Sequence, residues 1–372
     1  MKYKEPIALL LIGALLSGVV TVGAAEAGTA VNPLISLNWL RETFIPGAVS
    51  DADKRVEEEL ENLGNEIQSI TLQGSEHRVK RGDILWLNSG ASLTPLAGEL
   101  QLSSQSSKGT VLDVTEGFAI PFLTEQNDSK KAVLNHQYLA AEDSRIAVLV
   151  DSDTGVIRFS GNCEITLSKE TDYNALADAL RAMGLFRGSD VPYGSGYDLE
   201  STPTRIQGLV MFLRLIGEEQ AALNYPGSGI TYADVPDWAL PYVAYAYDKG
   251  YTKGQEIDDQ WRVVFGSDSP LAAQDYVTFL LRALGYTDGN GFEWETAIAD
   301  AKALGVLTEG EERQLTEKPF LRAQVAYLSF MSLSAQLTAG EGGTLLDRLT
   351  ASGAVSAAAA NSSMAGLEDQ RI

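Results

Sequence analysis

The sequence of 372 residues contains one cysteine, Cys163, and only two histidines, His77 and His136. A single cysteine excludes an intramolecular disulfide, so the fold has to be stabilised by packing. Cys163 lies in GNCEITL, a segment with strand character, and we interpret it as a small buried residue rather than a nucleophile. The same scarcity excludes a cysteine–histidine zinc site. We expect no metal and no cofactor.

Basic residues are also few, with 28 Lys and Arg against 50 Asp and Glu, which gives a net charge of −22. Nucleic acid is therefore excluded as a partner, because phosphate binding needs a basic surface. An anionic ligand would have to be held by a few placed groups rather than by the overall field. The sequence has no H-E-x-x-H, P-loop, G-x-S-x-G or dinucleotide-binding motif, and we expect no enzymatic activity.

The N-terminal residues contain one long apolar run, which covers residues 7–22. It follows Lys2 and Lys4 and precedes the small residues around Ala25 and Ala27, the order found in secretory signal peptides. At this length it is short for a membrane span, although an uncleaved anchor is the alternative. We predict a signal peptide over residues 1–30, export from the cell, and no membrane span after cleavage.

The rest of the chain predicts an α+β protein in several parts. Residues 31–68 have helical periodicity. The predicted helix either docks on or dimerises with a partner, or packs on the next domain. Residues 69–170 alternate with a period of two, which predicts a small all-β domain, a sandwich or a barrel. Within it we expect a hairpin around 151–155, where turn chemistry explains DSDTG without calcium. The low-complexity tail, residues 337–372, is expected to be mobile or a frayed helix.

Residues 171–336 contain three copies of one helical plan, at about 171–224, 228–287 and 288–336. In each copy a first helix opens with an aromatic residue and ends 11 or 12 residues later at a glycine; these pairs are Tyr173 and Gly184, Trp238 and Gly250, and Trp294 and Gly305. A second helix follows, and in the first two copies a glycine ends it, Gly217 and Gly285. A fixed offset repeated in this way indicates internal repeats, so we expect an all-α domain here.

These copies resemble the S-layer homology family. The segment from Tyr232 to Ala239, with Asp234, Val235 and Trp238, is similar to that family's opening, and Gly250 and Gly254 are similar to its turn. Thr204-Arg205-Ile206-Gln207 and Leu321-Arg322-Ala323-Gln324 resemble its motif at the start of the second helix, with Gln in place of Glu. The middle copy has lost the arginine and has Ala273 instead. The resemblance covers roughly Tyr173 to Leu333.

The resemblance implies three helical prongs around a pseudo-threefold core, with arginines in grooves that bind pyruvylated sugars of the secondary cell-wall polymer. A guanidinium at a helix start can hold such a carboxylate. The polysaccharide-binding candidates are Arg205, Arg322, Thr204, Gln207, Gln324, Asp234, Trp238 and Gly254. Two alternatives stay open. Each arginine could pair with an internal acid such as Asp234, and Trp238, Tyr242 and Tyr245 have the spacing of a buried helix face.

The predicted function is therefore that of a non-catalytic, extracellular surface protein. Its repeats would attach it non-covalently to anionic, pyruvylated cell-wall polysaccharide in the cell wall or surface layer. Two other functions fit the same sequence. The repeats could serve structural surface-layer assembly by packing against other surface proteins, or the β domain could be the receptor for a ligand of its own.

Overall fold

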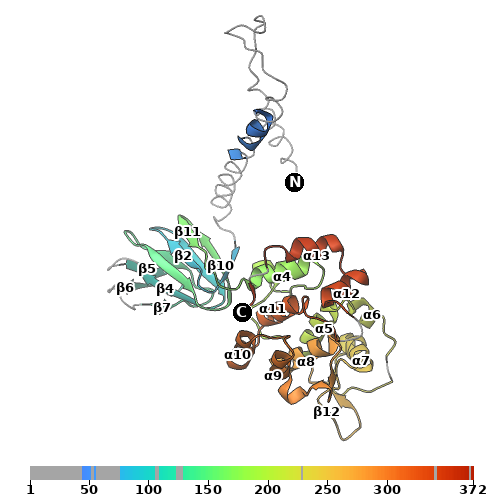
Figure 1. Cartoon of the computed structure of the whole chain (residues 1–372). Helices are drawn as coiled ribbons and strands as arrows, with labels where there is room; N and C mark the ends of the chain where they lie inside the picture. The colour runs from blue at the N-terminus through green and yellow to red at the C-terminus, as the bar shows by residue number, and fades with distance from the viewer. Residues whose placement is uncertain are drawn as a thin grey trace, which may run out of the picture. The chain divides into compact units, whose positions relative to one another are not determined.

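The structure, a computed structural model, describes residues 44–51, 54–55, 76–104, 109–122, 129–227, 229–338, 342–367 and 370–372 (Figure 1). The chain divides into two compact units, Met1–Ser69 and Ile70–Ile372. In the first unit residues 45–51 are helical, as expected for part of 31–68. The predicted signal peptide and most of that predicted helix lie outside the described residues. The second unit contains antiparallel sheets and helices, so the fold class is α+β.

The first half of the larger unit, which we call the β lobe (residues 76–166), consists of two antiparallel sheets. The six-stranded sheet has the order β1 (Glu76–Lys80), β10 (Thr154–Ser160), β3 (Ser92–Ala97), β8 (Tyr138–Ala140), β5 (Gly109–Asp113) and β6 (Phe118–Phe122). The five-stranded sheet has the order β11 (Cys163–Thr166), β2 (Ile84–Leu87), β9 (Ile146–Val150), β4 (Leu100–Ser104) and β7 (Lys130–Lys131).

The two sheets share one apolar core, to which Leu93 and Phe159 come from the larger sheet and Leu87, Leu102 and Val148 from the smaller. Side chains along β3 alternate between buried and half-buried, as a strand with one covered face requires. Two facing sheets around a common core form a sandwich, and this decides between the two architectures that the sequence left open.

The predicted hairpin around residues 151–155 was wrong. β9 pairs with β2 and β4, whereas β10 pairs with β1 and β3, so the two strands belong to different sheets. The Asp151–Asp153 segment carries the chain from one sheet to the other. A turn signal between two apolar runs fixes a change of direction, but it does not fix which strands pair.

The second half of the unit, the helical lobe (residues 173–372), contains these helices: α4 (Tyr173–Ala182), η2 (Gly194–Gly196), α5 (Arg205–Leu215), α6 (Glu219–Leu223), η3 (Asp237–Ala239), α7 (Leu240–Asp248), α8 (Ala273–Ala283), η4 (Trp294–Thr296), α9 (Ala297–Ala303), α10 (Glu309–Glu317), α11 (Arg322–Ser332), α12 (Leu345–Ala351) and α13 (Ala357–Met364). Two short strand pairs interrupt them, β12 (Glu256–Ile257) with β13 (Val263–Val264), and β14 (Thr287–Asp288) with β15 (Gly291–Phe292).

The first helices of the three sequence copies end alike. Gly184, Gly250 and Gly305 have φ of 77°, 75° and 74°, a left-handed conformation that favours glycine. In each case the next amide donates back across the last turn; the bonds run from Leu185 to Leu180, Tyr251 to Ala246 and Val306 to Ala301, at 2.8–2.9 Å. This is the Schellman arrangement, and the helix ends predicted from these glycines are confirmed.

The second helices, α5, α8 and α11, begin at Arg205, Ala273 and Arg322. The first amides of two of them donate to the segment that precedes a neighbouring second helix. Arg205 and Ile206 donate to Ser269 and Ser267, while Arg322 and Ala323 donate to Ser201 and Leu199, at 2.8–3.2 Å. The free amides of one helix start are thereby satisfied by the adjacent copy. The same bonding pattern therefore recurs at the starts of α5 and α11.

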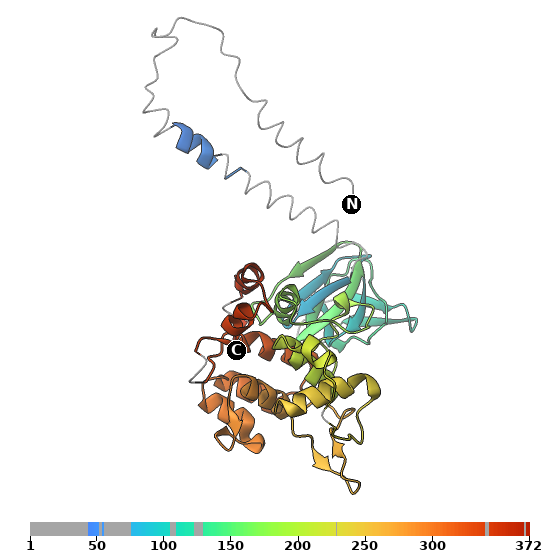
Figure 2. The ribbon, with the colours of Figure 1, turned by 90° about the vertical axis from the view of Figure 1, so that its right-hand side faces the viewer.

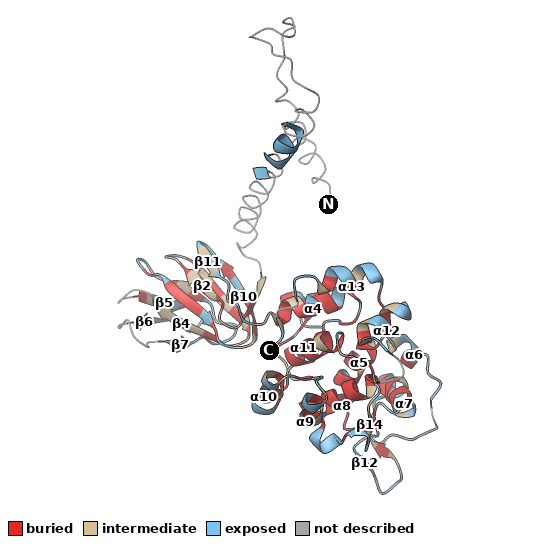
Figure 3. Cartoon of the chain, viewed as in Figure 1, coloured by how far each residue is buried: buried red, intermediate tan, exposed pale blue. Residues whose placement is uncertain are grey.

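The helices of this lobe surround one apolar core, visible as inward buried faces in Figure 3. Both α11 and α13 pack on α4, so that the last helices of the lobe lie against its first. No helix of the described part of the chain is both long and apolar enough to cross a membrane.

Of the two expectations for the tail, mobile or a frayed helix, the mobile one was wrong. The described residues of the tail include the helices α12 and α13, each opened by a hydroxyl cap, from Thr344 and Ser356. Leu345, Leu349 and Val355 are buried in the core of the helical lobe. The composition, rich in alanine and serine, hid these few apolar anchors, although alanine is the best helix former. Low complexity therefore did not imply disorder here.

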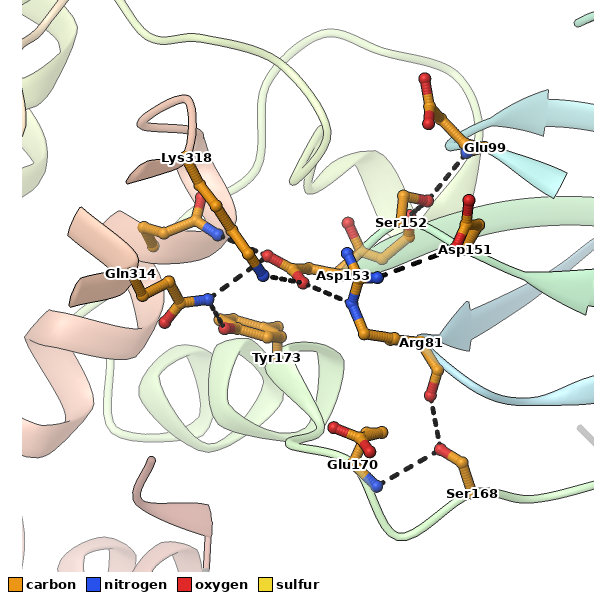
Figure 4. A network of polar contacts seen from close by, with 12 residues as sticks. Arg81, Glu99, Asp151, Ser152, Asp153, Ser168, Glu170, Tyr173, Gln314 and Lys318 are labelled. Atoms are coloured by element: carbon orange, nitrogen blue, oxygen red, sulfur yellow. Dashed lines mark hydrogen bonds and ion pairs between the residues drawn. The ribbon is translucent and has the colours of Figure 1, made fainter. Parts of the chain in front are cut away.

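The β lobe and the helical lobe are joined by polar contacts. Asp153, from the crossing between the sheets, accepts from Lys318 Nζ at 3.2 Å, Gln314 Nε2 at 3.4 Å and Gln324 Nε2 at 2.9 Å (Figure 4). Arg81 of the β lobe donates to the same carboxylate at 2.9 Å. A second contact, a bidentate pair between Arg78 and Asp178 at 3.0 and 2.7 Å, adds to it. Both lobes therefore belong to one folded unit.

Cys163 lies on the edge strand β11 and is half-buried against the core of the β lobe, rather than fully buried as predicted. Desolvation raises the pKa of its thiol to about 11. At pH 8 the folded protein should therefore hold about 100-fold less thiolate than the unfolded chain, and alkylation should be slow by that factor. Iodoacetamide labelling from pH 7 to 11, with the urea-unfolded chain as control, measures this. Equal rates in the two states would contradict it.

Candidate functional site

The site is centred on Arg205, the first residue of α5. Thr204 and Gln207 form a capping box, in which each side chain accepts from the other's backbone amide, at 3.4 and 3.0 Å. This fixes the start of the helix and directs Arg205 into the lobe, where it is 5% exposed. The guanidinium carbon lies 5.2 Å from the ring centroid of Phe265 and 5.9 Å from that of Phe279.

An internal carboxylate pairs with this arginine. Arg205 Nη1 lies 2.5 Å from Asp275 Oδ2, and both side chains are almost fully buried. Arg205 Nε has no hydrogen-bond partner within the described residues. The alternative of an internal ion pair is thus realised, with Asp275 rather than Asp234 as the partner. Asp275 lies in the first turn of α8. It follows by two residues Ala273, which stands where the other two copies have an arginine.

Arg205 nevertheless faces an open pocket of about 530 Å³, lined by this one residue of the first copy and otherwise by residues of the second and third copies. Its lining consists of three cations, four acids, two aromatic rings and three other residues: Arg205, Lys253, Arg282, Asp275, Asp288, Glu293, Glu295, Phe279, Trp294, Gly254, Gln255 and Thr278. A concave site with aromatic and charged groups together can hold a sugar ring with a polar substituent.

Trp294 is the aromatic residue of this pocket with the most accessible surface. It opens η4, is 47% exposed, and its indole Nε1 donates to Asp275 Oδ1 at 3.1 Å. Its backbone carbonyl accepts from the Gln274 side chain. These two bonds fix the indole at the rim of the pocket, beside the Arg205–Asp275 pair. A half-exposed, fixed indole offers a flat apolar face at little cost in side-chain entropy.

Most of the charge in the pocket is already balanced. Arg282 donates to Asp288 at 2.7 and 3.1 Å and to the carbonyl of Tyr251 at 2.9 Å. Burial favours a higher pKa for Asp288, but the hydrogen bond and charge of Arg282, together with Lys253, hold it below the usual value. Asp288 is therefore ionised at neutral pH. Lys253, with its side chain 67% exposed and 3.4 Å from Asp288, is the most accessible cation of the pocket.

The structure brings only two of the predicted residues, Arg205 and Gly254, into this pocket. Arg322 does not line it. The Arg322 guanidinium is buried, donates to the backbone carbonyls of Tyr197 and Arg187 at 3.0 and 3.3 Å, and lies 3.6 Å from the sulfur of Met211. Desolvation lowers the pKa of this arginine. Its role in the structure is to hold the loop before α5.

The remaining predicted residues also have structural roles. Thr204 and Gln207 cap α5, and Gln324, 2% exposed, caps α11 and binds Asp153. The carboxylate of Asp234 accepts from three consecutive amides, those of residues 265–267, at 2.6–2.8 Å. Trp238 is 58% exposed but does not line the pocket. Tyr242 and Tyr245 are buried, as the helix-face interpretation predicts.

Sequence reasoning missed Trp294 and Lys253 as site residues. The signal for both was present, since Trp294 opens the third copy as Trp238 opens the second, and Lys253 precedes Gly254 in the turn. What the sequence did not show is that one pocket combines Arg205 of the first copy with Lys253 of the second and Trp294 of the third.

No family model matches the chain, and no curated protein matches it significantly. Among the described residues no group of three or more histidine, cysteine, aspartate or glutamate side chains is placed to hold a metal ion.

Proposed function

We propose that this is a non-catalytic, exported surface protein whose helical copies bind an acidic cell-wall polysaccharide, as the resemblance to S-layer homology repeats implies. The observation that carries the proposal is the convergence of Arg205, Gly254 and a tryptophan, Trp294, each from a different copy, in one open pocket. An aromatic platform for a sugar face and cations for a single carboxylate are what such a ligand needs.

The balance of charge in the pocket refines this proposal. Arg205 is already paired with Asp275, so an incoming carboxylate meets Lys253 first and shares the arginine with an existing partner. We therefore expect weak binding per site and strong dependence on ionic strength. Arg322 is omitted from the proposed site because its guanidinium is already buried among backbone carbonyls. The proposal has one working groove, the pocket that combines Arg205 of the first copy with residues of the second and third copies.

Trp294→Ala tests the proposal. We expect at least tenfold weaker binding to purified bacterial wall sacculi whose polysaccharide carries pyruvate ketals, because the sugar face loses its platform. The control is Trp238→Ala, which removes a tryptophan of similar exposure from the corresponding place in the preceding copy. Co-sedimentation measures both variants. Thermal melting checks that Trp294→Ala, which also loses the hydrogen bond to buried Asp275, is still folded at the assay temperature.

Two outcomes would count against this function. Equal binding by Trp294→Ala and Trp238→Ala would remove the pocket from the proposal. Undiminished binding of the wild type to sacculi stripped of pyruvate would favour the alternative, in which the copies pack against other surface proteins.

A further inference from the structure

A third exposed tryptophan, after Trp238 and Trp294, lies on the short hairpin of β12 and β13, which projects from the helical lobe (Figures 1 and 2). Trp261, in the turn of this hairpin, is 86% exposed, and Ile257 beside the turn is 62% exposed. A large ring that is almost wholly in water contributes nothing to the core. Together with Ile257 it gives the hairpin an exposed apolar surface, and such surfaces can be contact sites.

The backbone at Trp261 is strained. Its φ is 60°, a left-handed conformation that is uncommon for a bulky residue and costs on the order of 1 kcal/mol. The surrounding turn enforces it. Asp258 Oδ1 accepts from the amides of Gln260 and Arg262 at 2.9 and 2.8 Å, and Oδ2 accepts from Arg262 Nε at 2.8 Å. The Trp261 amide itself donates to the Asp258 carbonyl at 2.9 Å.

The hydrogen bonds that Asp258 accepts lower its pKa, so it stays ionised and the turn is preserved at neutral and mildly acidic pH. Strain that the surrounding residues impose on an exposed side chain is a feature of binding sites rather than of scaffolds. Asparagine or glycine would adopt this conformation more easily. The turn therefore displays the indole at an energetic cost, in one fixed orientation.

The hairpin begins at the rim of the proposed sugar pocket. Lys253, Gly254 and Gln255 line that pocket, and β12 starts at the next residue. Gly254 has φ of 76°, and a Cβ there would lie 2.5 Å from Val263 of β13, so the rim and the hairpin are packed together. At about 3.3 Å per residue, Trp261 lies at most about 20 Å from Gln255. A chain of several sugars could contact both.

The charges on the hairpin indicate the kind of partner. Glu256, Asp258 and Asp259 stand against one cation, Arg262, which is paired with Asp258. An acidic finger is repelled by anionic lipid, which disfavours insertion into a membrane surface. The face of an uncharged sugar ring carries no such penalty, and it matches the flat indole.

We propose that Trp261 is a second subsite that stacks on an uncharged sugar of the same polysaccharide whose acidic unit enters the pocket at Trp294. This inference rests on the proposed function and extends it, because it makes the ligand a chain that spans two points rather than a single modified sugar. Two linked contacts strengthen binding of long chains beyond either contact alone.

Trp261→Asn is the sharpest test, since asparagine adopts the left-handed conformation and removes only the ring. We expect its melting temperature to equal that of the wild type or exceed it by up to about 3 °C. Its affinity for long chains of pyruvylated wall polysaccharide should fall about tenfold, while its affinity for the isolated repeating unit stays unchanged. Trp294→Ala should lose affinity for both the long chains and the isolated repeating unit, and Trp238→Ala should lose affinity for neither.

Any of the following results would contradict the proposed subsite at Trp261. If Trp261→Asn holds long chains like the wild type while Trp294→Ala does not, the subsite fails and the proposed function stands. If the wild type binds neither fraction, both fail. An equal loss of repeating unit and long chain in Trp261→Asn would place the indole within the pocket. Binding to phosphatidylglycerol vesicles that this substitution abolishes would assign the tryptophan to lipid.

Discussion

Replacing Arg205 by alanine should lower the free energy of unfolding by about 3–5 kcal/mol, because it leaves Asp275 as a buried, unpaired carboxylate. The two side chains are among the most buried charged groups of the helical lobe, and the guanidinium also fills the space between Phe265 and Phe279. Urea denaturation measures the loss. A decrease below about 1 kcal/mol would show that the pair is not buried as described.

A double variant with alanine at both Arg205 and Asp275 tests whether the unpaired carboxylate causes this loss of stability. If the penalty comes from the orphaned charge, removing both partners should cost less than the sum of the two single losses. Lys131→Ala is the matched surface control, because its pair with Glu99 is exposed on both sides and should contribute at most about 1 kcal/mol. Loss of wall binding in Arg205→Ala would therefore report unfolding, which is why the indole of Trp294 is the better probe.

The second large effect is expected for Asp153→Ala, which should lower the free energy of unfolding by about 3 kcal/mol. It should also weaken the contact between the two lobes. The substitution leaves the buried amide of Gln324 without its acceptor and removes the common partner of Arg81 and Lys318. Hydrogen exchange should then quicken in the strands and helices that meet there, more than elsewhere in the unit.

Asp151→Ala is the matched control for Asp153. Asp151 is two residues away and half-exposed, and its ion pair with Arg81 is long, at 3.9 Å. We expect it to change stability by less than about 1 kcal/mol. If both alanine variants behave alike, the junction does not depend on the Asp153 carboxylate. The β lobe would then be held by the Arg78–Asp178 contact and by packing.

Local features of this fold could be predicted from the sequence. The glycines that end α4, α7 and α9 were predictable because a left-handed residue at a helix end favours glycine whatever surrounds it. The starts of α5 and α11 were marked by the motif at residues 204–207 and 321–324. In the β lobe the period of two identified strands and one covered face for the same local reason.

Features that depend on distant partners could not be predicted. Asp275 lies 70 positions after Arg205, and nothing near either residue indicates that they pair. The strands on both sides of Asp153 were assigned to one hairpin because pairing partners lie elsewhere in the chain. Gln324 was assigned to the ligand on its place in a motif, whereas its partner is in the other lobe. Motif position alone does not separate a ligand contact from a structural contact.

The packing of α11 and α13 against α4 has a consequence for how molecules of this protein can associate. In solenoids each repeat leaves an open end on which a further repeat can stack, and terminal caps are needed to stop growth. Here the surface of α4 that another molecule's copy would need is already covered from within the same chain. Within the described residues, α4 is therefore not an open end on which a helix of another molecule could stack.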